Sequence, residues 1–496
     1  MLLLGIDVGT SSIKVSVVDG ATQQTIASAQ YPETESEIIS LQSGWAEQSP
    51  EKWWNDVRQA ILKVNSLGYY NKNDIGAIGI SYQMHGLVLL DKKGDVLRNS
   101  IIWCDSRAVS YGDRAFNELG SAYCLGCLLN SPGNFTAAKL AWVKEHEPEI
   151  YAQIHKIMLP GDFIAQRLTG DITTTPSALS EGIFWDFKTN ALSTEVLSQF
   201  GFEEKLIPEI NDVFSTHGKL SGKVADELSL KAGIPVTYKA GDQPNNALSL
   251  NVLQPGEVAA TAGTSGVIYG VSDQLTSDPQ SRVNSFAHVN HNAQQTRVGV
   301  LLCINGTGIL NKWVRNVTGN SLSYPQMNEQ AGAVKPGSDG LVMLPFGNGA
   351  ERILNNRVLG AQILNADFNK HSAAHLFHAA QEGIAFAFRY GLDIMRQSGM
   401  TPTVIRAGRA NMFLSNVFAN AFVNATGVPV ELYECDGSVG AALGAGIGVG
   451  YFHNAAEAFS GREILHIITP TQAEHYNDLY GNWQRALEGI LDNSDR

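Results

Sequence analysis

The sequence predicts an α/β protein of two domains that repeat one architecture. Its 496 residues exceed what a single hydrophobic core usually supports. Segments typical of strands are mixed with segments typical of helices along the whole chain. A strand–turn–strand pattern at residues 2–18 returns at residues 256–271, so each half opens on a similar hairpin. The alternative is a chance likeness between two ordinary hairpins.

The first hairpin contains a turn suited to binding an anion. An apolar strand ends at Asp7, and the turn after it consists of the small residues Gly9, Thr10, Ser11 and Ser12. Backbone N–H groups and hydroxyls of such a turn can converge on a phosphate, because nothing bulky blocks close approach. Asp7 is suited to holding Mg²⁺, a cation that prefers oxygen ligands and phosphate. We therefore predict a phosphate-binding turn with a metal-binding carboxylate beside it.

The second hairpin has the same kind of turn, formed by Gly263, Thr264, Ser265 and Gly266 between two apolar strands. One hairpin of this type is a weak signal by itself. Two of them, one at the start of each half, predict a nucleotide held between the halves.

Composition and charge restrict the partners of the protein. Hydrophobic residues make up 44% and charged residues 17% of the chain, as in globular proteins. The formal net charge of −13 argues against a nucleic-acid binder, whose surface is basic. No uncharged apolar stretch is long enough to cross a membrane, and the N-terminus lacks the basic region of a signal peptide, so we expect a cytoplasmic protein. Cys124 and Cys127 have a metal-like spacing, but no second pair completes a site, and reduced structural thiols are expected.

The first domain, which we expect to span residues 1–245, alternates strands and helices. A third strand follows the hairpin at residues 25–31. Ser49, Pro50 and Glu51 form a typical helix start, with Ser as the cap and Pro in the first turn. The other expected elements are a helix over 50–62, strands over 75–81, 87–91 and 101–105, a helix over 135–146 and a strand over 235–240.

The second domain, expected to span residues 246–496, contains a loop-rich region over 337–357, a helix over 375–395 and a glycine-containing segment over 436–444. A loop from Gly408 to Asn411 follows a strand-like segment, which suits a helix N-terminus near an adenosine. A plain strand-to-helix turn is the alternative. The chain has no P-loop motif and no complete dinucleotide fingerprint, which disfavours a dehydrogenase.

Gln83, Met84 and His85 directly follow a predicted buried strand. Side chains at such strand ends face the crevice in which α/β proteins usually bind ligands. The amide and the imidazole supply donors and acceptors that match sugar hydroxyls, and Met84 supplies an apolar surface. A core histidine packed beside a methionine is the alternative.

Asp242 also follows a predicted strand, within the turn-like sequence Gly241–Pro244. Phosphoryl transfer needs cradled phosphates, a placed Mg²⁺ and a carboxylate that deprotonates the attacking hydroxyl. Asp7 and Asp242 would supply two carboxylates with separate roles, one at the metal and one as the general base. A turn-stabilising aspartate is the alternative for residue 242.

Over nearly its whole length the chain resembles the FGGY carbohydrate kinases, and among them the xylulokinases. The resemblance rests on motifs in the same order along the chain, and residues 83–86 point to the xylulokinases. These motifs are residues 5–10 with Lys14, 45–50, 83–86, 103–107, 134–143, 159–162, 241–242, 263–266 and 440–444.

The resemblance implies two domains of the duplicated ribonuclease H-like fold of actin and hexokinase, with a cleft between them. It implies a sugar on the first domain, MgATP mainly on the second, Asp242 as the catalytic base and Asp7 near metal and phosphates. The implied sugar-binding residues are Gln83, Met84, His85, Trp103 and Asp242. The implied ATP-binding residues are Thr10, Ser11, Ser12, Lys14, Gly263, Thr264, Gly266, Gly408 and Asn411.

Three segments depart from the family pattern, at Gln243, at Glu351–Arg352 and at Arg406–Gly408. The predicted base Asp242 is unchanged, but these departures are expected to affect the contacts with the nucleotide and the preference for one sugar over another. We expect an ATP-dependent kinase that converts D-xylulose to D-xylulose 5-phosphate. A sister kinase for another ketose, polyol or sugar acid is the nearest alternative, and a non-catalytic nucleotide-gated module is the next. The sequence leaves the oligomeric state open, with a homodimer as one option.

Overall fold

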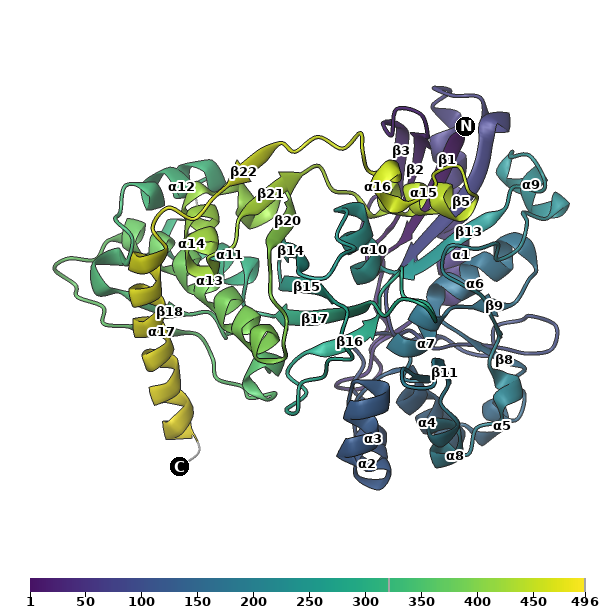
Figure 1. Ribbon diagram of the computed structural model, residues 1–496, viewed down its shortest axis with the longest axis horizontal. Coiled ribbons are helices and arrows are strands. Elements are labelled where there is room, and N and C mark those ends of the chain that lie inside the picture. The colour runs from purple at the N-terminus through teal and green to yellow at the C-terminus, as the bar shows by residue number, and fades with distance from the viewer. Residues whose placement is uncertain (320–321, 495–496) are drawn as a thin grey trace.

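Two central β-sheets, one in each half of the chain, organise the molecule (Figure 1). The structure is a computed structural model that describes residues 1–319 and 322–494. The first sheet has the strand order β13-β5-β1-β2-β3. The second has the order β16-β17-β15-β14-β20-β21-β22. The strands of the first sheet are β1 (Leu2–Val8), β2 (Ile13–Asp19), β3 (Thr25–Tyr31), β5 (Ile75–Tyr82) and β13 (Val236–Gly241). Those of the second are β14 (Glu257–Ala262), β15 (Gly266–Ser272), β16 (Asn284–Ala287), β17 (Val298–Ile304), β20 (Val404–Gly408), β21 (Val430–Tyr433) and β22 (His466–Ile468).

Five strands of each sheet follow the same scheme, which confirms the predicted duplication. In the first sheet, β1, β2 and β3 pair antiparallel in chain order, and β5 and β13 extend the sheet in parallel from β1. In the second sheet, β14, β15 and β17 form the antiparallel part, and β20 and β21 extend it in parallel from β14. The parallel strands β5 and β13 are almost completely buried, as expected for strands covered on both faces.

Helices cover both sheets. Helix α1 (Pro50–Ser66) begins as predicted, since the Ser49 side chain accepts a hydrogen bond from the Lys52 N–H. The helix expected over residues 375–395 is found as α13 (Ala373–Gln397). The other helices of six or more residues are α2 (Val109–Leu119), α4 (Thr136–His146), α6 (Pro160–Thr169), α7 (Pro176–Glu181), α8 (Thr194–Phe200), α9 (Gly222–Leu228), α10 (Asp242–Ser249), α11 (Gly308–Gly319), α12 (Tyr324–Gly332), α14 (Asn416–Thr426), α15 (Gly437–Gly448) and α17 (Ala473–Ser494).

The expected strand over residues 101–105 is much shorter than predicted. Only β7 (Ser100–Ile101) is a strand, and the chain then turns. The turn forms because the buried Asp105 carboxylate accepts hydrogen bonds from the N–H groups of Ala46 and Arg107. Trp103 is therefore on an exposed turn rather than on a strand.

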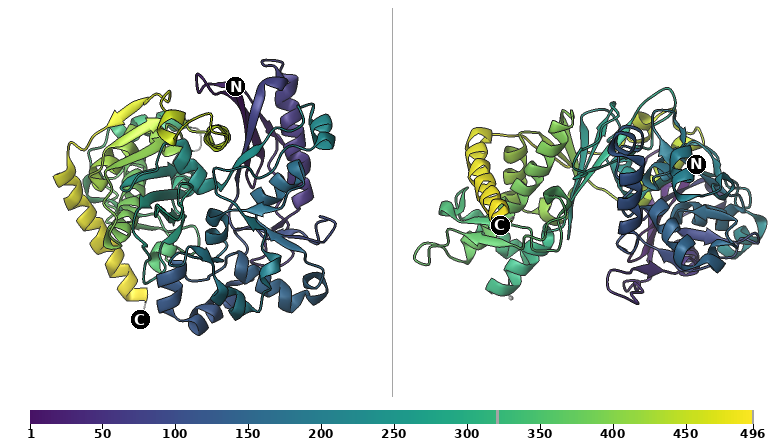
Figure 2. Two further views of the ribbon diagram at one scale, coloured as in Figure 1. Left: turned by 45° about the vertical axis from the view of Figure 1, so that its right-hand side comes forward. Right: turned by 90° about the horizontal axis from the view of Figure 1, so that it is seen from below.

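Helix α15 belongs to the second half by sequence but packs on the first sheet, against β1, β2, β5 and β13. In Figure 1 it lies beside the strands of the first half. Two glycines permit this close approach. A Cβ atom at Gly5 would lie 1.8 Å from the carbonyl oxygen of Ser438, and one at Gly79 would lie 1.9 Å from that of Ala441. The C-terminal helix α17, in contrast, runs along the outer side of the second half (Figure 2).

The edge strand β16 of the second sheet is bound to the first half. The Asn130 side chain accepts a hydrogen bond from the Ser285 N–H at 2.9 Å and donates one to its carbonyl at 2.5 Å. Ser177 and Ser180 of α7 bind the carbonyl and the N–H of Ala287, each at 2.8 Å. These bonds place the edge of one sheet beside the strand ends of the other. Among the helices within residues 1–319 and 322–494, none has the length and apolar character that a bilayer crossing needs.

Candidate active site

The predicted site residues of the first half meet at one edge of the first sheet. Strands β1, β5 and β13 are parallel neighbours, with Asp7 paired to Ser81 and Gly241 paired to Tyr82. Asp7, the segment after Tyr82 and Asp242 therefore lie at the same carboxyl edge, as expected for an α/β ligand site.

Asp242 is the first residue of α10, directly after β13. Burial raises the pKa of its carboxyl to about 7, and the nearby Asp7 carboxylate contributes to this shift. Hydrogen bonds from the backbone and side chain of Gln243 act in the opposite direction, so this departure from the family pattern contacts Asp242 directly. A carboxyl with a pKa near neutrality has the proton affinity that a general base needs.

Asp7 lies opposite a second carboxylate that the sequence analysis missed, Asp436. Burial raises the pKa of Asp7, a hydrogen bond with Ser81 lowers it, and the Asp436 charge raises it further. Asp436 caps α15 through the Ser438 N–H and forms an ion pair with Lys14. No local pattern marks Asp436, because it reaches Asp7 only through the packing of α15 on the first sheet.

The carboxylates of Asp7 and Asp436 fit a Mg²⁺ ion that is held partly by water and phosphate. Mg²⁺ is usually bound by one or two carboxylates together with substrate phosphates, and rarely by a complete protein cage. Within residues 1–319 and 322–494, no group of three or more His, Cys, Asp or Glu side chains could hold a metal.

His85 is held in a strained backbone conformation at the same edge. Its φ angle of 62° lies in the left-handed region, which non-glycine residues rarely adopt. Its N–H donates to the Glu181 carboxylate at 3.2 Å, and its Nδ1 lies 3.0 Å from the Glu181 carbonyl oxygen. The ring packs against Phe135 and against Phe286 of the second half, with centroids 4.8 and 5.4 Å away.

The His85 side chain is 15% exposed, so its ring reaches the surface of the site and is not a fully enclosed core residue. Burial lowers the pKa of its imidazole to about 3, which keeps the ring neutral near pH 7. Met84 beside it is buried, and its side chain lies against Gly241, where a Cβ atom would be 2.6 Å from Met84 Cγ. Burial also raises the pKa of Glu181 well above its usual value. The sequence analysis missed Glu181, which ends the short, buried helix α7 and has no local motif around it.

The first hairpin and the predicted sugar residues form one hydrogen-bond network. Thr10 Oγ1 donates to Gln83 Oε1 at 3.2 Å and accepts from Trp103 Nε1 at 3.0 Å. Gln83 Nε2 donates to Gln48 Oε1 at 3.0 Å, and Gln48 in turn donates to the Thr10 carbonyl at 2.8 Å. Thr10, predicted to bind ATP, thus contacts two residues predicted to bind sugar. Trp103 remains 53% exposed, which leaves its ring available to a ligand.

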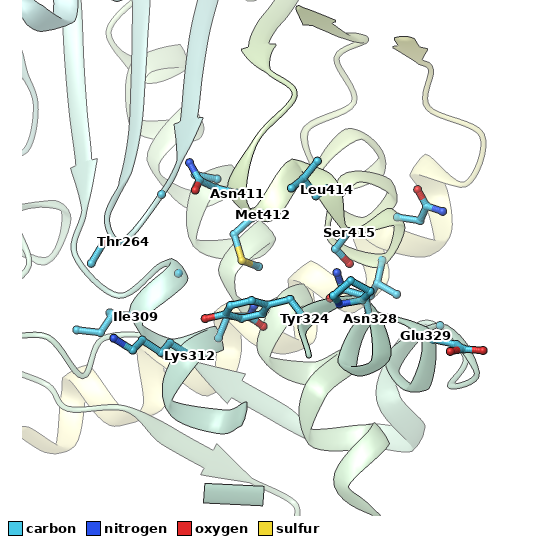
Figure 3. Close-up of a pocket in the computed structure, with 18 residues that line it drawn as sticks. Thr264, Ile309, Lys312, Tyr324, Asn328, Glu329, Asn411, Met412, Leu414 and Ser415 are labelled. Atoms are coloured by element: carbon cyan, nitrogen blue, oxygen red, sulfur yellow. The ribbon is translucent and has the colours of Figure 1, made fainter. Parts of the chain in front are cut away.

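A cavity of about 940 Å³ lies in the second half (Figure 3). The predicted ATP-binding residues Gly263, Thr264 and Asn411 line it. Lys312, Tyr324 and Asn328 lie along one side, and Asn411 and Met412 lie across from them (Figure 3). Several further lining residues were missed by sequence reasoning, since α11, α12 and the start of α14, which carry most of them, show no motif. They are Gly308, Ile309, Asn311, Lys312, Tyr324, Pro325, Asn328, Glu329, Gly332, Met412, Leu414, Ser415, Asn416 and Val417, with Ala262 beside the hairpin.

The N-terminus of α11 meets the second hairpin at this cavity. The Gly308 N–H donates to the Gly263 carbonyl at 2.9 Å, and the Ile309 N–H donates to the Thr264 carbonyl at 3.2 Å. A buried carboxylate fixes the loop before α11, because Glu351 accepts hydrogen bonds from the N–H groups of Asn305 and Gly306, each at 3.1 Å. The first N–H groups of α11 are thus already bonded, and what this helix end offers a phosphate is the positive end of its dipole beside the glycine turn.

Other predicted ATP-binding residues lie outside this cavity. Gly266 and Gly408 are not among its lining residues, and a Cβ atom at Gly266 would stand 2.4 Å from the Phe388 ring, which indicates a packing role. Every lining residue belongs to the second half. The first-half residues Thr10, Ser11, Ser12 and Lys14 are instead at the edge of the first sheet, beside Asp7.

Comparisons with known proteins agree with this architecture. Residues 2–249 match the model of the FGGY family of carbohydrate kinases, N-terminal domain, and residues 258–449 match that of its C-terminal domain. A xylulose kinase of Bacillus subtilis (strain 168) is 28% identical over 460 residues, which cover 92% of this chain and 90% of that protein. The crystal structure of a xyloylose kinase from Brucella ovis is 25% identical, covers 99% of both chains and superposes with a TM-score of 0.89. A gluconate kinase from Lactobacillus acidophilus has the same fold at 21% identity, with a TM-score of 0.88 over 99% of this chain and 98% of that chain.

Proposed function

The chain belongs to the FGGY family of carbohydrate kinases, and we propose that it transfers the γ-phosphoryl group of ATP to D-xylulose, giving D-xylulose 5-phosphate. The observation that carries the proposal is Asp242, a partly buried carboxyl with a pKa of about 7 at the edge where the predicted sugar residues meet. The similarity to the Bacillus subtilis xylulose kinase supports the choice of sugar.

In the proposed reaction the sugar binds at His85, Gln83 and Trp103, with Met84 beneath it. Asp242 accepts the proton of the terminal hydroxyl as that oxygen attacks the γ-phosphorus and the bond to the β-phosphate oxygen breaks. Nδ1 of the neutral His85 ring donates to the Glu181 carbonyl, so Nε2 offers an acceptor to a sugar hydroxyl, which an imidazolium would not.

The nucleotide occupies the cavity of the second half, with its phosphates toward Gly263, Thr264 and the N-terminus of α11. Because Thr10, Ser11, Ser12 and Lys14 are on the other half, they reach the terminal phosphate across the cleft, and closure of the two halves would exclude water. Asp7 and Asp436 would hold Mg²⁺, which neutralises phosphate charge when it is bound. Gly408 is proposed to support the loop to Asn411 at the adenosine.

The proposal also covers the domain boundaries, the cellular location and the oligomeric state. We divide the chain into a sugar-binding domain, residues 1–245, and an ATP-binding domain, residues 246–496, with α15 returning to the first sheet. We place the enzyme in the cytoplasm, where ATP and sugar phosphates are metabolised. A homodimer is the assembly proposed, since twofold dimers are the commonest oligomers.

A coupled ADP-release assay over ketoses, polyols and aldonates tests the function, with Asp242→Asn as the control for background ATP hydrolysis. We expect the highest kcat/KM with D-xylulose. Higher kcat/KM with a polyol or an aldonate would transfer the proposal to a sister kinase. This alternative has a specific basis, because the gluconate kinase has the same fold. Absence of sugar-dependent ADP release would favour a non-catalytic nucleotide-gated module.

A further inference from the structure

The peptide groups on both sides of His85 are bound by buried ionisable side chains. On the amide side, the His85 N–H donates to Glu181. On the other side, the His85 carbonyl accepts a hydrogen bond from Lys139 Nζ at 2.8 Å and one from Thr136 Oγ1 at 3.3 Å. A left-handed conformation at a non-glycine residue persists only where its surroundings determine it, and these bonds supply that constraint.

Lys139 also binds a second segment of the site. Its Nζ donates to the Ile102 carbonyl at 3.0 Å, and that carbonyl belongs to the peptide bond that leads into Trp103. One ammonium group therefore connects the chain at His85 with the chain just before Trp103. These two residues follow different strands, β5 and β7, and the proposed sugar lies between them.

The surroundings of Lys139 are energetically unfavourable for a charged side chain. The side chain is completely buried, and within residues 1–319 and 322–494 no carboxylate lies within ion-pair distance of it. Its hydrogen-bond partners are backbone carbonyls, and burial lowers the pKa of its amino group to about 7, while the more distant Asp105 charge acts in the opposite direction. Burying an ammonium without a counter-charge costs much more free energy than burying a neutral side chain of similar size.

We propose that Lys139 is a positioning residue of the sugar site, which fixes His85 and Trp103 relative to each other by binding the carbonyl groups of His85 and Ile102. This inference rests on the proposed function, because it takes His85 and Trp103 as sugar contacts. It assigns Lys139 no contact with the sugar or the nucleotide. Loss of Lys139 should therefore affect sugar binding and leave nucleotide binding intact.

The test compares Lys139→Met, which keeps the length of the side chain and removes its donors, with Lys139→Arg, which keeps a charged donor. Steady-state kinetics are measured with the sugar that the wild type phosphorylates. We expect Lys139→Met to raise the sugar KM by about tenfold or more, the loss typical of a charge-assisted hydrogen bond. We expect the ATP KM to stay within about twofold and Lys139→Arg to recover part of the sugar KM.

Lys156 provides a matched control in the same half. Its Nζ also donates to two backbone carbonyls, those of Lys205 and Ile207, each at 2.8 Å, but outside the proposed site. Lys156→Met should leave both KM values unchanged. Equal effects of Lys139→Met and Lys156→Met, or equal increases in the KM of sugar and of ATP, would overturn the inference.

A second pair of variants covers the case in which Lys139→Met does not fold. Lys139→Gln leaves only a neutral donor on a side chain one bond shorter, which cannot bind both carbonyls as Lys139 does, and Thr136→Val removes one bond to the His85 carbonyl. An unchanged sugar KM in both would reject the positioning role. If the wild type phosphorylates a sugar other than D-xylulose, the proposed substrate is wrong, while the same comparison with that sugar still decides the role of Lys139. If the wild type phosphorylates no sugar, the function and the inference both fall.

Discussion

The Asp7 carboxylate lies directly against the first residue of α15, Gly437. A Cβ atom built on Gly437 would stand 2.4 Å from Asp7 Oδ2, closer than non-bonded atoms approach. Gly437 does not adopt a left-handed conformation, so alanine would be excluded by this contact and not by its own backbone. The two residues come from opposite ends of the chain, and their contact fixes where Asp7 points.

Gly437→Ala is therefore expected to displace Asp7 and to weaken the binding of Mg²⁺. The variant should need more Mg²⁺ for half-maximal activity, while sugar KM changes little. Gly222→Ala is a matched control, because Gly222 also begins a helix and a Cβ atom there would meet nothing within 4 Å. Titration of activity with Mg²⁺ on both variants is the measurement, and a normal Mg²⁺ requirement in Gly437→Ala would contradict the placement of the metal at Asp7.

Asp242→Asn should fold and bind both substrates but lose turnover, because asparagine has the same shape and cannot accept the proton. Loss of a general base typically costs about 10²–10⁴ in rate. Asp7→Asn should differ by an additional change in Mg²⁺ dependence. The kcat and the melting temperature are measured on the same preparation. If turnover of Asp242→Asn stayed within a few-fold of the wild type while its melting temperature fell, Asp242 would be a structural turn residue.

The raised pKa of Asp242 predicts two opposite pH effects. Activity should increase as pH rises through about 7, because the carboxylate form is the base. The free energy of unfolding should decrease over the same pH range, as pH rises toward 7. The folded pKa is above the unfolded value of 3.8, so the stabilising contribution is complete below that value and is lost as pH rises through about 7. Melting temperatures between pH 5 and 8 should fall less in Asp242→Asn than in the wild type, and parallel curves would contradict the prediction.

The two glycines of the second hairpin should respond differently to valine. Gly263 lines the cavity proposed for the nucleotide, and a Cβ atom there meets nothing closer than 3.7 Å. Gly263→Val should therefore fold and weaken ATP binding, since its side chain enters the space next to the phosphates. Gly266→Val should instead lower the melting temperature through its clash with Phe388. Calorimetric titration with ATP, with a thermal melt of each variant, separates the two, and unchanged ATP affinity in Gly263→Val would argue against the phosphate assignment.

The sequence could predict those features of the protein that depend on residues close together in the chain. Neighbouring residues determine each of these features. They are the two hairpins, the strand ends at Asp7, Gln83 and Asp242, and the capped start of α1. The structure bears out the duplicated α/β fold that these patterns predicted.

The residues that sequence reasoning missed act through contacts between distant segments. Glu181 reaches the His85 amide from a helix almost one hundred positions away in the chain, and Asp436 reaches Asp7 only because α15 packs on β1. Lys312 and Tyr324 lie on helices without a motif, and only tertiary packing brings them to the cavity. Gly266 illustrates the limit of a motif, because this motif glycine packs against Phe388 and is not among the residues that line the cavity of the second half.

The placement of α15 on the first sheet also governs how the protein can be made. The first sheet needs residues 437–448 to cover β1 and β5, so a fragment that ends at residue 245 would expose buried apolar strands to water. Expressed alone, such a fragment should aggregate, although its counterpart in the intact chain is well packed. During synthesis the N-terminal strands emerge early, yet their cover emerges only after most of the chain has left the ribosome. The first half of the nascent chain therefore cannot complete its packing until α15, which is encoded near the 3′ end of the mRNA, has been synthesised.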